Sequence, residues 1–281
     1  MNLTHARPLA SVGLAALVSL AYAAPARAQV APPLGELGDF AVLGNSGVTG
    51  STGAGTLVLG DVGSSPTASI SNFPPSTVAP PFTLHLTNDA EVQQAHADAI
   101  AASGFLAAQG PGTVLAAQLD TVVLTSGIYS FQGGAADLAA NGTLTLNGPG
   151  VFVFQVDSAL TANVNSNVVG TADPCSVFWR VGTSATLNGV TFRGNVIADA
   201  SVTVGDGSNV TGRTIAGTGP TGAVTMAGDG GNTIGGCSSV DDEVPDTAIP
   251  TLGEGAMVAL VALLAGMGLL VLRRRSVQAR R

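Results

Sequence analysis

The chain is built from short apolar runs, each closed by Gly, Asn, Asp or Pro. Similar runs return at drifting intervals, and Asn188–Gly217 nearly repeats itself, with Val190, Thr191 and Arg193 matched by Val210, Thr211 and Arg213. A drifting period of about 20 positions indicates one supersecondary unit that is restated with loose turn lengths. This pattern predicts a β-solenoid. An all-β sandwich, with strands at intervals of about 8–12 positions, is the alternative.

The composition supports a stack of small coils. Of 281 residues, 38 are Gly, 46% are hydrophobic, 10% are charged and 4% are aromatic. Disorder is disfavoured because the chain is apolar and its charges are sparse. We expect small β-branched side chains to fill a narrow lumen better than aromatic rings, and Gly, Asn and Asp to occupy corners that need positive φ.

One segment departs from the strand pattern and predicts a helix over about residues 88–109. It is rich in Ala and Gln and contains no Pro. A single helical stripe collects Val92, Ala95, Ala99, Ala102 and Leu106. Thr87 or Asn88 is the expected N-cap, with Asp89 in the first turn. We expect this helix to pack its small-residue face along the solenoid axis.

The N-terminus has the pattern of a secretory signal peptide. His5 and Arg7 precede an apolar run, and Ala26-Arg27-Ala28 offers a small-x-small cleavage site. We expect cleavage after residue 28 and a mature domain over residues 29–237. An uncleaved membrane anchor is the alternative. The protein is therefore expected to be exported, secreted or held at the cell surface.

The C-terminus carries a second signal after an acidic linker at residues 238–248. An apolar run over residues 256–272, at the short limit for a transmembrane helix, precedes five arginines that favour a cytoplasmic end. Residues 249–281 resemble the IPTL-type bacterial sorting signals, whose motif is matched by Ile249, Pro250, Thr251, Leu252 and Glu254. Gly253 and Gly255 stand where that family commonly has Ser and Trp. The resemblance implies export machinery and processing by an exosortase-like membrane protease, whereas a permanent anchor is the alternative.

The order of motifs across residues 37–234 resembles the microbial secreted ice-binding proteins. The matching stretches include LGDFAVLGNSGVTGS, GDVGSSP, NFPP, LTSGIYSF, LTLNGPGVFVFQV, CSVFWRVGTSATL, FRGNVIADASVTV and GRTIAG. This resemblance implies an irregular, right-handed parallel β-solenoid with a flanking helix. It also implies that the first strands do not close the coil alone, and that the chain winds back alongside them after the helix.

The two cysteines, Cys175 and Cys237, bracket the last expected coils. In an oxidising compartment they favour a disulfide, which would contribute about 4 kcal/mol by the chain-entropy model. A pair of free buried thiols is the alternative. Neither His85 nor His96 has a neighbouring cysteine or a second His at i+4, so we expect no metal site and no cofactor.

Threonines recur between inward-facing apolar neighbours, which turns their side chains outward. The candidate binding residues are Thr145, Thr161, Thr186, Thr191, Thr203, Thr211 and Thr225. Stacked coils would space such threonines by about 4.8 Å, close to an oxygen repeat in ice. A methyl group, a hydroxyl group and a stiff χ1 suit each of them to ordering water. Exposed strand positions also favour Thr without any ligand.

We therefore expect a non-catalytic protein whose partner is ice or ordered water. A structural or adhesive surface protein that binds polysaccharide is the alternative. Nucleic acid is a poor partner, because the chain has no lysine and its body has three arginines against seventeen acidic residues. An enzyme would have to use Arg180, Arg193, Arg213, Asp199 or Asp206, with Arg193 and Arg213 stacked, but no paired-carboxylate motif accompanies them.

Overall fold

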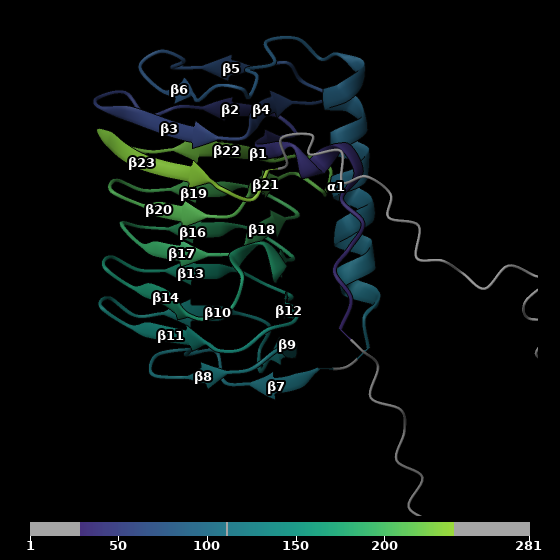
Figure 1. Ribbon diagram of the computed structural model, residues 1–281, viewed down its shortest axis with the longest axis vertical. Helices are drawn as coiled ribbons and strands as arrows, with labels where there is room; N and C mark the ends of the chain where they lie inside the picture. The colour runs from purple at the N-terminus through teal and green to yellow at the C-terminus, as the bar shows by residue number, and fades with distance from the viewer. Residues whose placement is uncertain (1–28, 111, 239–281) are drawn as a thin grey trace, which may run out of the picture. The chain divides into compact units, whose positions relative to one another are not determined.

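Three parallel sheets form the sides of a β-solenoid, and one α-helix lies along it (Figure 1). The structure is a computed structural model that describes residues 29–110 and 112–238. The fold expected from the short apolar runs is confirmed as far as parallel coils and a single flanking helix are concerned. The shortness of many strands follows from the Gly, Asn and Asp that close each run.

Nearly every coil gives one strand to each sheet, and the coil of β7 and β8 gives none to sheet B. Sheet A contains β1 (Phe40–Gly44), β4 (Asp61–Ser64), β7 (Thr113–Leu115), β9 (Gly127–Phe131), β12 (Phe152–Val156), β15 (Val177–Val181), β18 (Asn195–Ala198) and β21 (Thr214–Ala216). Sheet B contains β2 (Gly47–Thr49), β5 (Ile70–Ser71), β10 (Ala136–Leu138), β13 (Leu160–Ala162), β16 (Ala185–Leu187), β19 (Val202–Val204) and β22 (Ala223–Met226). Sheet C contains β3 (Gly55–Leu59), β6 (Thr77–Val78), β8 (Val123–Leu124), β11 (Thr143–Leu146), β14 (Asn167–Gly170), β17 (Thr191–Arg193), β20 (Asn209–Thr211) and β23 (Gly230–Gly235).

The chain does not wind through the stack in one direction. Strands β1 to β6 form two coils at one end, and the helix α1 (Ala90–Ala108) then carries the chain to the other end, where β7 begins (Figure 1). The later coils wind back until β21, β22 and β23 pair with β1, β2 and β3. The expected return of the last coil to the first strands is therefore confirmed.

Aromatic rings fill the lumen of the larger coils, so the expectation that small β-branched side chains fill it better than aromatic rings is wrong there. Phe154 pairs in register with Tyr129 on one side and Trp179 on the other. The Phe154 and Trp179 rings stack with centroids 3.8 Å apart, and Phe192 continues the row at 5.3 Å from Trp179. More residues separate the paired positions Phe154 and Trp179 than separate the next pair, Trp179 and Val196, so the first of these coils is longer. The longer coils leave more width between the sheets, and the large rings occupy it.

Helix α1 packs on sheet A with the predicted face. All five residues of the expected stripe are fully buried, and they meet Val153, Phe178, Ile197 and Ile215 of the sheet. The N-cap prediction is wrong by one or two positions. Asp89 is the N-cap, and its Oδ1 accepts a hydrogen bond from the Val92 amide at 3.0 Å. A carboxylate at this position also interacts favourably with the helix dipole.

One disulfide bond and one buried arginine hold the C-terminal end of the solenoid domain in place. Cys175 and Cys237 form the expected disulfide, with Cα atoms 5.3 Å apart. Arg213 is buried beside it and donates to Asn195 Oδ1 at 2.9 Å and to the carbonyl oxygens of Gly38 and Cys237. Burial lowers the pKa of Arg213 to about 10, against the opposing effect of Asp39. These contacts join the first, middle and last parts of the domain.

The expected signal peptide, acidic linker, sorting motif and transmembrane run lie almost wholly outside the described residues, apart from Ser238. Within residues 29–110 and 112–238, no helix has both the length and the hydropathy to cross a membrane. Besides the three sheets and α1, the described residues contain two short 3₁₀-helices, η1 (Gly35–Gly38) and η2 (Pro174–Ser176).

Candidate functional site

Sheet B presents one continuous column of hydroxyl-bearing side chains. Its in-register members are Thr161, Thr186, Thr203, Thr225, Thr49 and Ser71, in that order across β13, β16, β19, β22, β2 and β5. Six rungs at a strand spacing of about 4.8 Å give the column a length of about 24 Å. We call this set the threonine column. Its charged neighbour at one end is Asp137 on β10.

Alternation along each strand turns these hydroxyls outward. In β16, for example, Ala185 and Leu187 are buried while Thr186 between them is partly exposed. Within the described part of the chain, the side chains of Thr161, Thr186, Thr203 and Thr225 make no hydrogen bond to other protein groups. Thr49 accepts one from Ser71 at 3.3 Å. Four adjacent hydroxyl groups are therefore available to solvent at a regular spacing.

The residues two positions before the column are all small. They are Ala159, Ser184, Ser201, Ala223, Gly47 and Ser69. Ser184 Oγ accepts from the Ser201 amide at 3.4 Å, and Ser201 Oγ accepts from the Ala223 amide at 3.2 Å, so both hydroxyl groups lie back against the turn. No bulky side chain in this second row rises beside the threonine column. This second row is therefore lower than the threonine column.

Three of the seven predicted threonines do not belong to this surface. Thr145, Thr191 and Thr211 lie on β11, β17 and β20 of sheet C. Their in-register neighbours differ in chemistry: Thr145 lies between Val123 and Val169, Thr191 between Asn167 and Asn209, and Thr211 between Arg193 and Gly235. Four of the seven candidates therefore share one column and three do not, because each coil has several sides and similar runs, such as Leu144-Thr145-Leu146 and Leu160-Thr161-Ala162, lie on different ones.

The repeat that is visible in the sequence is not the structural register. Thr191 pairs with Asn209, and Arg193 pairs with Thr211, so the register is shorter than the sequence repeat. The expected stack of Arg193 on Arg213 is therefore wrong. Arg213 follows the end of β20, and its buried side chain donates to Asn195 and to the carbonyl oxygens of Gly38 and Cys237. Packing decides the register here, because Phe192 must align with Val210 inside the lumen.

Sequence reasoning missed Thr49 and Ser71 at one end of the column. Thr49 is next to Thr225 only because the last coil returns to the first strands, from the opposite end of the domain. The short tripeptides Ser184-Ala185-Thr186 and Ser201-Val202-Thr203 were a local signal for the second row, since residues i and i+2 share one face of a strand.

Sheet B is also the most regular of the three sides. Helix α1 covers sheet A, and bulky or charged residues such as Leu57 and Arg193 interrupt sheet C. Sheets A and C each contain a register shift, next to Phe40 in β1 and next to Gly230 in β23, whereas the pairings of sheet B contain none. A bulge bends its strand, so unbroken register favours an even surface.

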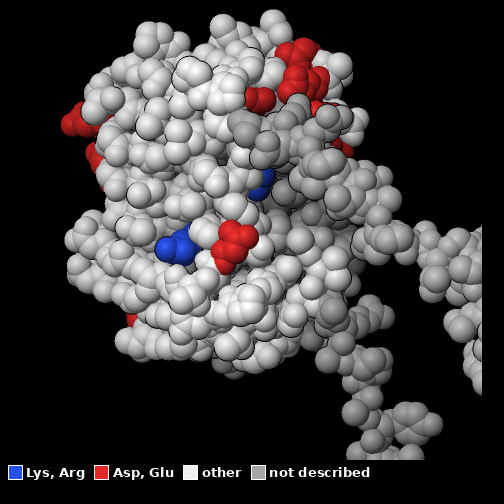
Figure 2. Space-filling model, in the orientation of Figure 1, with Lys and Arg blue, Asp and Glu red and all other residues white. Residues whose placement is uncertain are grey.

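The polar residues considered for catalysis are dispersed. Arg180 pairs with Asp199 at 3.1 Å and with Asp157 at 3.5 Å, while Asp206 Oδ1 accepts from the Gly230 amide at a corner. Figure 2 shows a face that is mostly uncharged, with separate basic side chains, acidic side chains gathered mainly at the upper right, and no basic patch. The five residues considered for an enzyme do not converge on a common point that could act on a substrate.

The family of the chain follows from comparison with known proteins. A model of the family described as "Ice-binding-like" matches residues 42–232, which include the whole helix and almost all strands of the solenoid. The chain belongs to the ice-binding-like family. A second model, the IPTL-CTERM motif, matches residues 247–275. That match spans the predicted motif residues Ile249 to Glu254.

Similar proteins in this family come from bacteria and fungi. An ice-binding protein of Nostoc sp. is 36% identical over 204 residues, covering 70% of this chain and 73% of its own. Ice-binding protein 1 of Shewanella frigidimarina is 31% identical over 217 residues, but the match covers only 24% of that longer protein. The crystal structure of an ice-binding protein from the Antarctic ascomycete Antarctomyces psychrotrophicus superposes with a TM-score of 0.64 at 31% identity, over 73% of this chain and 98% of that one.

Proposed function

We propose that this ice-binding-like protein adsorbs to ice through the threonine column of sheet B and so restrains crystal growth or recrystallisation near the cell. The observation that carries the proposal is the unbroken register of Thr161, Thr186, Thr203, Thr225 and Thr49 on the one side with no bulge and no cover. Relatives named as ice-binding proteins support the choice of ice over a polysaccharide.

The physical basis is the sum of many weak contacts on a preformed surface. Each threonine places a methyl group and a hydroxyl group side by side on a side chain with a stiff χ1, so little conformational entropy is lost on adsorption. The methyl group favours ordered water around it, and the hydroxyl group anchors that water by a hydrogen bond. Because the rungs repeat at about 4.8 Å, the anchored waters share the regularity of the backbone.

We also propose that the protein acts outside the cytoplasm, which suits a protein that must meet ice. Residues 1–28 would direct export and be removed, and residues 249–281 would hold the protein at the membrane through residues 256–272 until an exosortase-like protease acts. The disulfide is in keeping with an oxidising compartment. A right-handed winding of the coils belongs to the same proposal, as the sense expected for parallel crossovers.

The experiment is to grow a single ice crystal in a solution of the purified protein and to follow recrystallisation in a frozen film. We expect faceted crystals, a gap between melting and growth temperatures, and small grains that persist on annealing. Round crystals and unrestrained grain growth at high protein concentration, combined with retention on a polysaccharide column, would instead support the adhesive alternative.

A further inference from the structure

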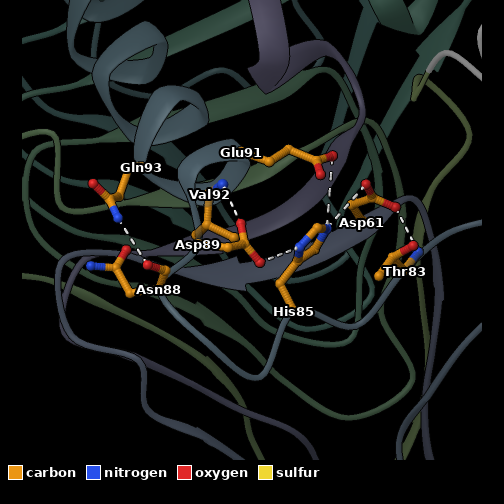
Figure 3. A network of polar contacts seen from close by, with 8 residues as sticks. All are labelled: Asp61, Thr83, His85, Asn88, Asp89, Glu91, Val92 and Gln93. Atoms are coloured by element: carbon orange, nitrogen blue, oxygen red, sulfur yellow. Dashed lines mark hydrogen bonds and ion pairs between the residues drawn. The ribbon is translucent and has the colours of Figure 1, made fainter.

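The first turn of α1 is joined to sheet A by a cluster of one buried histidine and three carboxylates, which the ice-binding surface does not use. His85 precedes the helix, Asp61 is on β4, and Asp89 and Glu91 are at the helix N-terminus (Figure 3). The side chains of His85 and Asp61 are only 6% and 10% exposed. Glu91 is 45% exposed and closes the cluster on the solvent side.

Backbone amides hold two of the carboxylates in this cluster, those of Asp61 and Asp89, in place. Asp61 Oδ1 accepts from the Thr83 amide at 2.7 Å, which leaves Oδ2 facing the histidine. Asp89 Oδ2 lies 3.1 Å from His85 Nδ1, while its Oδ1 caps the helix. The ring of His85 also lies against Phe40, with centroids 5.2 Å apart. These contacts leave His85 Nε2, Asp61 Oδ2 and Glu91 Oε1 pointing toward one another (Figure 3).

The distance from His85 Nε2 to Asp61 Oδ2 fits shared coordination better than a charge-assisted hydrogen bond, and Glu91 Oε1 lies slightly farther out. Nε2 is 3.4 Å from Asp61 Oδ2 and 3.9 Å from Glu91 Oε1, and all three atoms lie within 4.8 Å of one another. Charge-assisted hydrogen bonds to a carboxylate are shorter, at about 2.7–2.9 Å. Tetrahedral zinc with bonds of about 2.0–2.1 Å holds neighbouring ligand atoms about 3.3–3.4 Å apart.

The electrostatics of the cluster favour an added positive charge. The carboxylates of Asp61, Asp89 and Glu91 all lie within 3.9 Å of the His85 ring nitrogens, so three acidic groups surround one imidazole. Among the described residues, His85 is the only basic group paired with these carboxylates.

We propose that His85 Nε2, Asp61 Oδ2 and Glu91 Oε1 bind a divalent transition-metal ion of the zinc class, with water as the remaining ligand. The nitrogen and carboxylate donors suit Zn²⁺, and Asp89 on Nδ1 supplies the carboxylate–histidine contact that commonly fixes the ring of a metal-bound histidine. The ion links β4, the segment before the helix and the first turn of α1. It is a structural clamp that holds the helix on the solenoid.

The test uses the full-length protein after dialysis against a chelator, with Zn²⁺ titrated in a calorimeter near neutral pH. We expect one equivalent to bind, and Glu91→Gln to weaken that binding by at least about tenfold. Glu36→Gln is the matched control, because it removes a nearby carboxylate that is not among the three ligands. We expect this control to bind Zn²⁺ as the wild type does. Circular dichroism of the buried Trp179 checks that each variant is folded.

Two further readings separate a metal site from a simple ion pair. Zn²⁺ should raise the melting temperature of the wild type and of Glu36→Gln but not of Glu91→Gln, because a ligand stabilises only the state that binds it. Cobalt(II) bound in the same place should give the visible absorption of a four-coordinate ion. No Zn²⁺ binding by the wild type, or equal weakening by both variants, would overturn the proposal and leave His85 as a protonated partner of its carboxylates. None of these readings depends on ice.

Discussion

At the scale of single residues, threonine differs from serine and valine because its Cβ carries both a methyl group and a hydroxyl group, with a restricted χ1. In the threonine column, Thr186 and Thr203 lie at the middle of the surface, flanked by buried neighbours that fix the backbone. Valine at these positions keeps the branched shape and the χ1 preference, whereas serine keeps only the hydroxyl group. The pair of substitutions therefore separates the contribution of shape from that of hydrogen bonding.

We expect the double substitution Thr186→Ser with Thr203→Ser to reduce ice-growth inhibition more than the corresponding double substitution to Val. Serine loses both the methyl groups and the rotamer restriction that keep the array regular. The measurement is the gap between melting and growth temperatures at matched concentrations, with thermal unfolding as the control. A larger loss for valine than for serine would show that the hydroxyl groups alone determine the activity.

At the scale of single elements, α1 could be predicted because its signal is local. The stripe of Val92, Ala95, Ala99, Ala102 and Leu106 repeats at helical spacing and is buried as a unit. The assignment of threonines to sheets could not be predicted in the same way. Thr145 and Thr161 have similar flanking residues, yet they lie on sheets C and B. The positions of the corners between them are known only from the three-dimensional structure.

We expect Ala99→Leu to lower the free energy of unfolding by about 1–3 kcal/mol, because the helix meets sheet A without space for three more carbon atoms. Ala101→Leu is the matched control: the residue is exposed two positions along the same helix, and its change should stay within about 0.5 kcal/mol. Urea unfolding followed by Trp179 fluorescence measures both. Equal stability of the two variants would contradict tight packing between α1 and sheet A.

At the scale of the whole molecule, the path of the chain determines the length of the ice-binding surface. The neighbours Thr225 and Thr49 come from opposite ends of the domain, so the column is continuous only when the last coil docks on the first. The family resemblance predicted this return, but periodicity could not, because pairs such as Val42 with Thr214 carry no local signal. The disulfide and Arg213 secure the same junction.

We expect replacement of both Cys175 and Cys237 by Ser to lower the free energy of unfolding by about 4 kcal/mol, since the open chain gains conformational entropy when unfolded. Denaturant unfolding of the oxidised protein and of the variant gives the difference. Ice-growth inhibition should survive at low temperature as long as the variant is folded. Unchanged stability would mean that Arg213 and the strand pairs alone hold the junction.

The most direct test of the ice-binding surface is to place one bulky side chain on sheet B and an identical one on sheet C. Thr203→Tyr raises a ring above the centre of the threonine column, and Thr191→Tyr places the same ring on an exposed strand of the other open side. We expect Thr203→Tyr to abolish most ice-growth inhibition and Thr191→Tyr to preserve it, with both variants folded. Loss of activity in Thr191→Tyr with full activity in Thr203→Tyr would contradict this assignment and place ice binding on sheet C.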